Sequence, residues 1–264
     1  MFPKILDLGP LTIHTYGLLL AAAFISGIWV ASHNARKSGI SPDLIWNMGL
    51  VVIFSALVGA KLLLLISDFQ YYSQNIREIF SLSTLRSMGV YYGGLLLALA
   101  SAALFLAKKH LPFWTTADLA APGIALGQAI GRIGCLSAGC CYGKPTHLPW
   151  GITFTDSYAY NNVGVTLNVP LHPTQIYESL GALSLFVFLM WRLPRKHTNG
   201  LILLEYLILY SILRFVIEFF RGDERGFVLY GLLSTSQFIA VSTILGSVAA
   251  YYWLLRRPTE VHQN

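Results

Sequence analysis

Four polar residues recur along one face of an apolar stretch near residue 210. Tyr210, Arg214, Glu218 and Arg221 are spaced four, four and three residues apart in LILYSILRFVIEFFR. On a helix this spacing places them in one narrow stripe, where Glu218 can pair with both Arg214 and Arg221. Two arginines against one glutamate leave an excess positive charge, and a planar guanidinium suits a phosphate. The stripe therefore favours an anion site, with a self-neutralising ion-pair ladder as the structural alternative.

A further arginine follows a glycine stripe in another apolar stretch. Gly123, Gly127 and Gly131 recur at every fourth residue, which predicts close packing against a neighbouring membrane helix. Arg132 comes next, and an arginine inside a span costs at least ~2.5 kcal/mol on insertion scales. The alternative is an anchor whose long side chain reaches back to the interface. The position of Arg132 favours a functional role.

Other polar groups lie at the starts of apolar stretches. In HPTQIYE, Gln175 and Glu178 follow a predicted helix start, and His172 precedes it. His172 and Glu178 can act as acid or base, but a loop histidine and a helix-end glutamate are as often structural. His14 and Tyr16 have the same two interpretations, because tyrosine is a common anchor at membrane interfaces.

The three cysteines, Cys135, Cys140 and Cys141, fall within seven residues of one another. They have no histidine partner at ligand spacing, so we expect no metal site. The adjacent Cys140 and Cys141 can scarcely form a disulfide with each other. A disulfide between Cys135 and Cys140 is an alternative if these residues lie on an oxidising outer face.

These candidates must be held by elements that suit a membrane. The chain is 55% hydrophobic and 11% charged, whereas a soluble domain has about a quarter charged residues. A spanning helix needs about 20 mostly apolar residues. Seven stretches qualify, at about 13–33, 44–66, 89–107, 115–136, 174–191, 201–220 and 232–255. The sequence therefore predicts an all-α polytopic membrane protein with about seven transmembrane helices.

Basic residues follow every second predicted span. They are Arg36, Lys37, Lys108, Lys109, Arg192, Arg195, Lys196, Arg256 and Arg257. By the positive-inside rule these connections are cytoplasmic, so the N-terminus lies outside and the C-terminus inside. The loops at about 67–88, 137–172 and 221–231 then face outwards, where the polar candidates also gather.

The same patterns limit the organisation and the partners. The basic residues form no continuous face, so we do not expect nucleic-acid binding. No repeat or linker divides residues 1–264, which favours one domain. The first span is too long for a cleavable signal peptide, so we expect it to remain in the mature protein.

The chain resembles the prolipoprotein diacylglyceryl transferase family over essentially its whole length. The matching motifs are HTYG at 14–17, YGG at 92–94, GRIGCLSAGCCYG at 131–143, HPTQIYE at 172–178 and LRFVIEFFR at 213–221. Several separate motifs in the right order make a chance similarity improbable. The resemblance implies a seven-helix enzyme of the bacterial cytoplasmic membrane, with an outward-facing active site and no cofactor. It also implies transfer of the diacylglyceryl group of phosphatidylglycerol to the lipobox cysteine of a prolipoprotein, the first step of bacterial lipoprotein maturation.

The resemblance also implies roles for individual residues. Arg132 matches the arginine that binds the phosphatidylglycerol headgroup. The matches to catalytic positions are Tyr16, Tyr92, Tyr210, Arg214, Glu218 and Arg221. Tyr92 replaces a histidine that is often proposed as the base, so the base is left unassigned. The secondary candidates are His14, His172, Gln175, Cys135 and Cys140.

The cysteines depart from the familiar signature of the family. Cys135 stands where an asparagine is usual, and Cys140 stands where a glutamate is usual. Neither cysteine is expected to be a covalent nucleophile, because a thioether is a poor leaving group and the intermediate would be a dead end.

Two alternatives stay open at this point. A related membrane transferase would move the same lipid group to a different acceptor. A seven-helix carrier is the alternative of a different class, but it should place ionisable residues near mid-membrane and on both sides.

Overall fold

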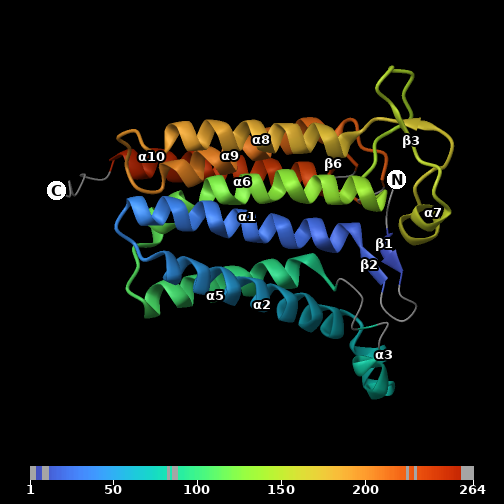
Figure 1. Ribbon diagram of the computed structural model, residues 1–264, viewed down its shortest axis with the longest axis horizontal. Helices are drawn as coiled ribbons and strands as arrows, with labels where there is room; N and C mark the ends of the chain where they lie inside the picture. The colour runs from blue at the N-terminus through green and yellow to red at the C-terminus, as the bar shows by residue number, and fades with distance from the viewer. Residues whose placement is uncertain are drawn as a thin grey trace. The chain divides into compact units, whose positions relative to one another are not determined.

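Long helices form most of the chain in the computed structural model (Figure 1). The structure describes residues 4–7, 12–81, 84, 89–223, 226–228 and 231–256. Helices occur at every predicted span, with ends that differ by a few residues. They are α1 (Thr15–Lys37), α2 (Pro42–Ser67), α5 (Tyr91–Lys108), α6 (Phe113–Ala138), α8 (Thr174–Arg192), α9 (Leu201–Glu218) and α10 (Thr235–Arg256). Arg257 and parts of the loops predicted at 67–88 and 221–231 lie outside the described residues.

Within the described residues, five helices are long and apolar enough to cross a membrane, namely α1, α2, α5, α6 and α10. Large apolar side chains such as Phe54 and Leu245 stay exposed on them. Exposed apolar surface of this extent suits lipid rather than water. The helices α8 and α9 lie where two more spans are predicted, but they are not among these five. The helix α9 carries three charged residues, Glu205, Arg214 and Glu218. The chain is thus a multi-pass membrane protein, and the number of spans beyond these five stays a prediction.

The chain divides into two compact units, residues 1–34 with 117–264 and residues 35–116. In the unit of residues 35–116, α2 packs along α5. Gly59 and Gly93 make this approach possible, because a methyl group on either would overlap the main chain of the other. Two short helices, α3 (Phe69–Gln74) and η1 (Ile76–Phe80), follow α2.

The other unit contains most of α1 and α6 and all of α8, α9 and α10. The backbones of α1 and α6 touch at Gly27 and Gly123, and a methyl group on Gly127 would lie 3.1 Å from the Ala23 carbonyl oxygen. The predicted close packing is confirmed for Gly123 and Gly127. It is wrong for Gly131, where a methyl group would meet open space.

Polar contacts join α8 and α9 to α6. Ser179 on α8 donates its hydroxyl to the Ala129 carbonyl at 2.8 Å. The Tyr206 hydroxyl on α9 donates to Gln128 at 2.7 Å. Around these bonds lies a buried apolar cluster of Ala121, Ala125, Leu189, Ile202 and Tyr206.

The start of α9 is capped by a residue of α6. The main-chain N–H groups of Gly200 and Leu203 donate to the Asp118 carboxylate at 2.6 and 2.8 Å. His197 Nε2 lies 3.5 Å from the same carboxylate. A first-turn N–H group has no partner inside its own helix, so Asp118 supplies one and fixes where α9 begins.

Three short two-stranded antiparallel sheets accompany the helices in the described part of the chain. They are β1 (Lys4–Asp7) with β2 (Thr12–His14), β3 (Ile152–Thr153) with β4 (Pro170–Leu171), and β5 (Phe227–Val228) with β6 (Leu233–Ser234). The register pairs Ile152 with Leu171 and Phe227 with Ser234.

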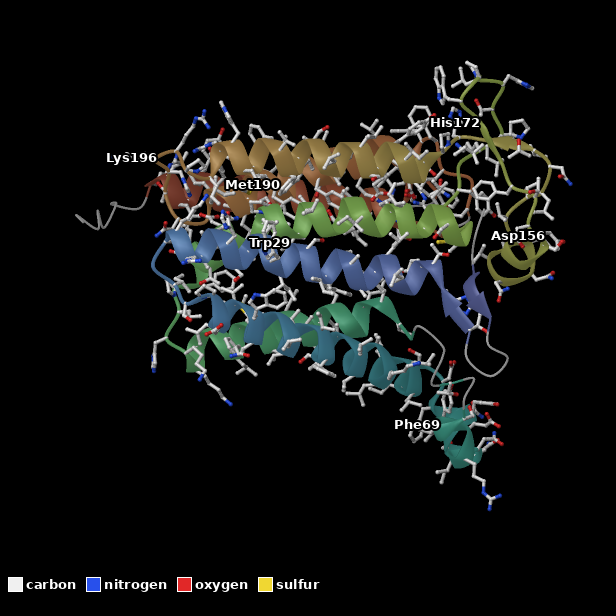
Figure 2. All side chains as sticks on the ribbon, in the orientation of Figure 1. Trp29, Phe69, Asp156, His172, Met190 and Lys196 are labelled. Carbon is white, nitrogen blue, oxygen red and sulfur yellow. The ribbon has the colours of Figure 1, made fainter. Side chains whose placement is uncertain are left out.

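The segment predicted as a long loop at 137–172 is a small folded cap. It contains β3, β4 and α7 (Ser157–Val163) around a core of Phe154, Ala159, Val165 and Leu171. In the unit of residues 1–34 with 117–264, Asp156 and His172 lie at the opposite end from Lys196 (Figure 2). The cap therefore covers the end of the helices that is remote from the basic connection between α8 and α9.

Candidate functional site

Main-chain hydrogen bonds join three segments at the capped end of the helices: the segment after α6, the one before α8 and the one after α9 (Figure 1). Gly143 donates its N–H to the His172 carbonyl at 3.1 Å, and Lys144 donates to the Phe220 carbonyl at 2.8 Å. A side chain at position 143 would overlap the main chain of both neighbouring segments, so glycine is required there. The ends of three helices are thereby held together.

Glu178 is the centre of one polar cluster at this junction. Its Oε1 accepts a hydrogen bond from the Tyr210 hydroxyl at 2.8 Å and lies 2.8 Å from Arg132 Nη2. Its Oε2 lies 4.0 Å from Arg221 Nη1. The Glu178 side chain is 1% exposed, and a carboxylate at that depth needs opposite charge and hydrogen-bond donors. Glu178 therefore orients both Arg132 and Tyr210.

Arg214 and Glu218 form a second cluster, and their predicted pairing is confirmed. Arg214 Nη2 lies 2.7 Å from Glu218 Oε2 and donates to Ser236 Oγ at 3.1 Å. Ser234 donates its hydroxyl to Glu218 Oε1 at 2.8 Å. Arg214 Nη1 is buried and has no hydrogen-bond partner among the described residues. A buried donor left without an acceptor is costly, so this nitrogen is suited to receive an oxygen of a bound anion.

Arg221 departs from the predicted stripe. Its Nε and Nη2 donate to the two carboxylate oxygens of Asp223 at 2.8 and 2.7 Å. The predicted pairing of Arg221 with Glu218 is wrong, because α9 ends at Glu218 and the chain turns before it reaches Arg221. The helical spacing that would align the two side chains does not continue through that turn.

The formal charges of the site cancel. Arg132, Arg214 and Arg221 are paired with Glu178, Glu218 and Asp223. The excess positive charge predicted from α9 alone is therefore offset by carboxylates on other segments. Attraction for an anion must come from directed guanidinium donors rather than from net charge.

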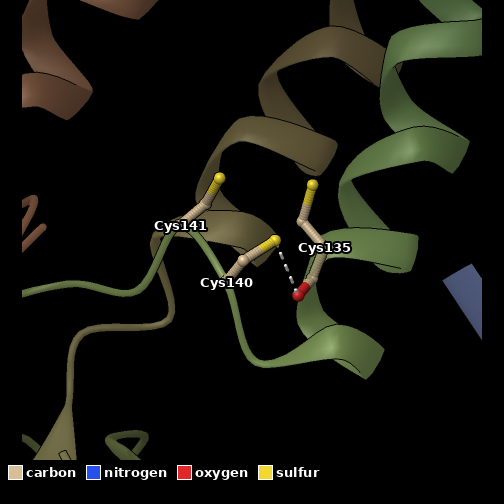
Figure 3. A group of neighbouring side chains, drawn as sticks. All are labelled: Cys135, Cys140 and Cys141. Carbon is tan, nitrogen blue, oxygen red and sulfur yellow. Dashed lines mark hydrogen bonds between the residues drawn. The ribbon is translucent and has the colours of Figure 1, made fainter. Parts of the chain in front are cut away.

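The three cysteines come together at the end of α6 and in the segment that follows it (Figure 3). Their sulfur atoms all lie within 4.8 Å of one another, and none forms a disulfide. Arg132 Nη1 lies 3.7 Å from Cys141 Sγ, and Cys140 Sγ lies 3.7 Å from the Cys135 carbonyl oxygen. Hydrogen bonds from the Cys135 and Cys140 thiols lower the pKa of the Cys141 thiol below its ordinary value, and Arg221 adds to that effect.

Tyr16, Gln175 and His172 also lie at this end of the unit. A methyl group on Gly134 would lie 3.3 Å from the Tyr16 ring, so that ring packs on α6 next to Cys135. Gln175 Nε2 donates to the Cys140 carbonyl at 2.8 Å. His172 instead belongs to an aromatic group, with its Nδ1 3.3 Å from the Tyr177 hydroxyl.

One predicted residue of this unit is not brought into these clusters. His14 is exposed at the end of β2. Tyr92 is 49% exposed on α5 and belongs to the unit of residues 35–116.

Several residues of the site had weak or no signals in the sequence. The sequence indicates Glu178 as an acid or base candidate near a helix start, but not as the partner of Arg132 and Tyr210. Asp223, Ser234 and Ser236 were not singled out, because their importance depends on partners from other segments.

The chain is similar to known proteins along nearly all of its length. The family model described as prolipoprotein diacylglyceryl transferase matches residues 3–253. A phosphatidylglycerol-prolipoprotein diacylglyceryl transferase from Clostridium tetani is 39% identical over 245 residues, which cover 93% of this chain and 94% of the relative. A protein of the same name from Geobacillus kaustophilus is 34% identical over 263 residues, covering 96% of this chain and 91% of the relative. Another from Synechococcus elongatus is 32% identical over 260 residues, covering 96% and 87%.

Proposed function

The chain belongs to the prolipoprotein diacylglyceryl transferase family, and we propose that it transfers the diacylglyceryl group of phosphatidylglycerol to a prolipoprotein cysteine. The observation that carries this proposal in the structure is the buried Arg214 with an open donor nitrogen. A phospholipid supplies the anionic oxygen that such a donor needs, and an apolar helical protein gives its acyl chains a place.

The reaction is a displacement at the glycerol carbon that carries the phosphate. The acceptor thiolate forms a C–S bond while the C–O bond to the phosphate breaks. The electron pair of that bond leaves on the phosphate oxygen, and the products are a thioether and glycerol phosphate. Nucleophilic sulfur reacts as the thiolate, and donors aimed at the departing phosphate stabilise the charge that develops on it.

We assign the phosphate to Arg132 and Arg214. Arg132 is held by Glu178 and Arg214 by Glu218, each at ion-pair distance, so both guanidinium planes are preset. Tyr210 shares Glu178 with Arg132 and positions it. Arg221 is a further contact for the headgroup once it exchanges Asp223 for the lipid. Tyr16, whose ring packs on α6, is proposed to contact the substrates. For Tyr92 the family motif alone supports the proposed catalytic role.

The topology is proposed to have seven spans, with the N-terminus outside and the C-terminus in the cytoplasm. The support is the basic pattern after alternate helices, as at Lys109 and Lys196. The site then faces the outer side of the bacterial cytoplasmic membrane. That is the side where a secreted precursor with a lipobox cysteine would meet it.

Mass spectrometry of a lipobox peptide tests this function. The full chain is incubated with the peptide and phosphatidylglycerol, and the peptide should gain the mass of one diacylglyceryl group. A peptide with serine in place of the acceptor cysteine is the matched control and should stay unchanged. No mass gain on the cysteine peptide, from a folded protein with the lipid present, would refute the function.

A further inference from the structure

The three sulfur atoms beside Arg132 have the arrangement of a metal site. Their mutual distances are all within 4.8 Å. Zinc binds thiolates at about 2.3 Å, so tetrahedral geometry needs sulfur atoms about 3.8 Å apart. The sulfur atoms lie at most about 1 Å farther apart than that spacing. The cysteine positions in the sequence gave little support for a metal, whereas the positions of the sulfur atoms fit one.

The backbone around the cysteines is held by residues at the start of α8. Thr174 donates its hydroxyl to the Cys141 carbonyl at 2.7 Å, and Gln175 donates to the Cys140 carbonyl at 2.8 Å. Thr174 and Gln175 are fully buried. Cys141 has a φ of +63°, which a residue with a side chain rarely adopts. This conformation persists where its surroundings impose it, and here its sulfur lies within 4.8 Å of the other two (Figure 3).

The number of ligands indicates the kind of metal site. Among the described residues, the cluster contains three ligands, all of them cysteines. Structural zinc sites are closed by four protein ligands, whereas catalytic sites have three and leave one position for substrate. The three cysteines are half-buried rather than sealed, so a fourth ligand can enter.

We propose that Cys135, Cys140 and Cys141 bind one zinc ion as thiolates, and that its open position takes the thiol of the acceptor cysteine. This inference rests on the proposed transfer function. The zinc ion is what activates the acceptor thiol. Neither Glu178 nor Glu218 is free to act as the base, because each carboxylate is already paired with an arginine.

The chemistry balances without any redox change. The acceptor thiol loses its proton to water on binding the metal, as thiol ligands do. The bound thiolate donates an electron pair to the glycerol carbon, and the C–O electron pair leaves on the phosphate. The product is a neutral thioether, which is a poorer ligand than a thiolate and vacates the position.

The surroundings suit both the charge and the geometry of this step. Three thiolates and one zinc ion carry one negative charge, and the acceptor thiolate adds another. Arg132 Nη1 lies 3.7 Å from Cys141 Sγ, so a directed guanidinium donor stabilises this negative charge although Arg132 is also paired with Glu178. Because Arg132 is also assigned to the lipid phosphate, the nucleophile and the reacting carbon would be neighbours.

Metal content of the purified full chain is the first test. The chain is prepared under reducing conditions without chelator, and elemental analysis should find about one zinc per chain. Cys135→Ser, Cys140→Ser and Cys141→Ser should each lose most of it. Ser137→Ala is the matched control, because that side chain contacts the Gly134 carbonyl and not the cluster. Should a cysteine variant fail to fold, Gln175→Ala keeps all three thiols and should weaken zinc binding by roughly 10–100-fold.

Cobalt substitution tests the open position separately from transfer activity. Cobalt in place of zinc should give thiolate charge-transfer absorbance, which should increase when a cysteine lipobox peptide is added. The serine peptide should leave the spectrum unchanged. An equal response to both peptides would overturn the role of the fourth position.

Transfer assays then separate this inference from the proposed function. Chelated protein should lose transfer and recover it on addition of zinc. Full activity of metal-free protein would overturn the zinc proposal and leave the transferase function intact. Zinc binding without transfer under any condition would refute the function instead. A disulfide between Cys135 and Cys140 would lower the mass of the chain by two hydrogens. The metal site would also be overturned if a reduced preparation retained that disulfide and contained no zinc.

Discussion

Replacing Arg214 with lysine tests whether its open nitrogen receives the lipid phosphate. A lysine ammonium can keep the pair with Glu218, which spans 2.7 Å in the native protein. It lacks the planar fork that would also reach Ser236 and the open position together. Removing one directed donor to a developing negative charge lowers kcat by roughly 10²–10³-fold, or about 2.7–4 kcal/mol. We therefore expect kcat to fall roughly 100-fold or more.

Lysine is chosen because alanine would mix two effects. Arg214→Ala leaves the buried Glu218 with the Ser234 hydroxyl as its remaining side-chain partner among the described residues. Removing one partner of a buried ion pair costs roughly 3–5 kcal/mol of stability. A loss of activity in the alanine variant would then report unfolding as much as catalysis.

The assay is steady-state transfer to a labelled lipobox peptide in mixed micelles with phosphatidylglycerol, alongside thermal unfolding of each variant. Arg192→Lys is the matched control, because Arg192 pairs with Glu205 at 3.3 Å in the same unit and outside the site. It should retain kcat. Near-native kcat for Arg214→Lys, at an unchanged Tm, would show that the open nitrogen does not act on the substrate.

Three further predictions concern packing, pH dependence and topology. Gly123→Ala should lower the free energy of unfolding by roughly 1–3 kcal/mol, because its methyl group meets the Gly27 backbone. Gly131→Ala on the same helix is the control and should be tolerated. Equal effects of the two variants in denaturant titrations would contradict the packing. The hydrogen bond to Asp118 raises the pKa of His197 despite its partial burial, so its contribution to stability is full below about pH 6.5 and is lost as pH rises through the raised pKa. The Tm advantage of the native chain over His197→Gln should therefore be greatest below about pH 6.5 and should shrink as the pH rises above that value, and a constant difference would exclude this coupling. Reporter fusions after Lys37, Lys109 and Lys196 should give cytoplasmic signals and fusions near Asn75 and Asn161 outer signals, and an outer signal after Lys196 would break the seven-span topology.

Local patterns were enough to predict the helices. A helix in lipid needs a long apolar stretch and satisfies its own backbone, so its position is written in consecutive residues. The pair of Arg214 with Glu218 was predictable for the same reason, because its spacing of four residues depends on one helix alone. The prediction failed for Arg221, since the helix ends before that residue and the spacing rule ends with it.

Contacts between distant segments could not be predicted in this way. Glu178 pairs with residues of α6 and α9, and Asp223 removes Arg221 from its expected partner. Gly131 repeats the spacing of Gly123, yet it meets open space where α6 has no close neighbour. Each outcome depends on which helices pack together, and local spacing does not contain that information.

By itself, the sequence determined the membrane character, the helix positions and the family to which the chain belongs. Those properties follow from apolar stretches and from motifs that are each continuous along the chain. The tertiary structure alone decided that Glu178 would stand between Arg132 and Tyr210, and that three thiols would converge within 4.8 Å. These groups come from helix ends and connecting segments, and main-chain bonds such as Gly143 to His172 set their separation. Chemistry that requires several groups at ångström distances is therefore settled only when those segments pack.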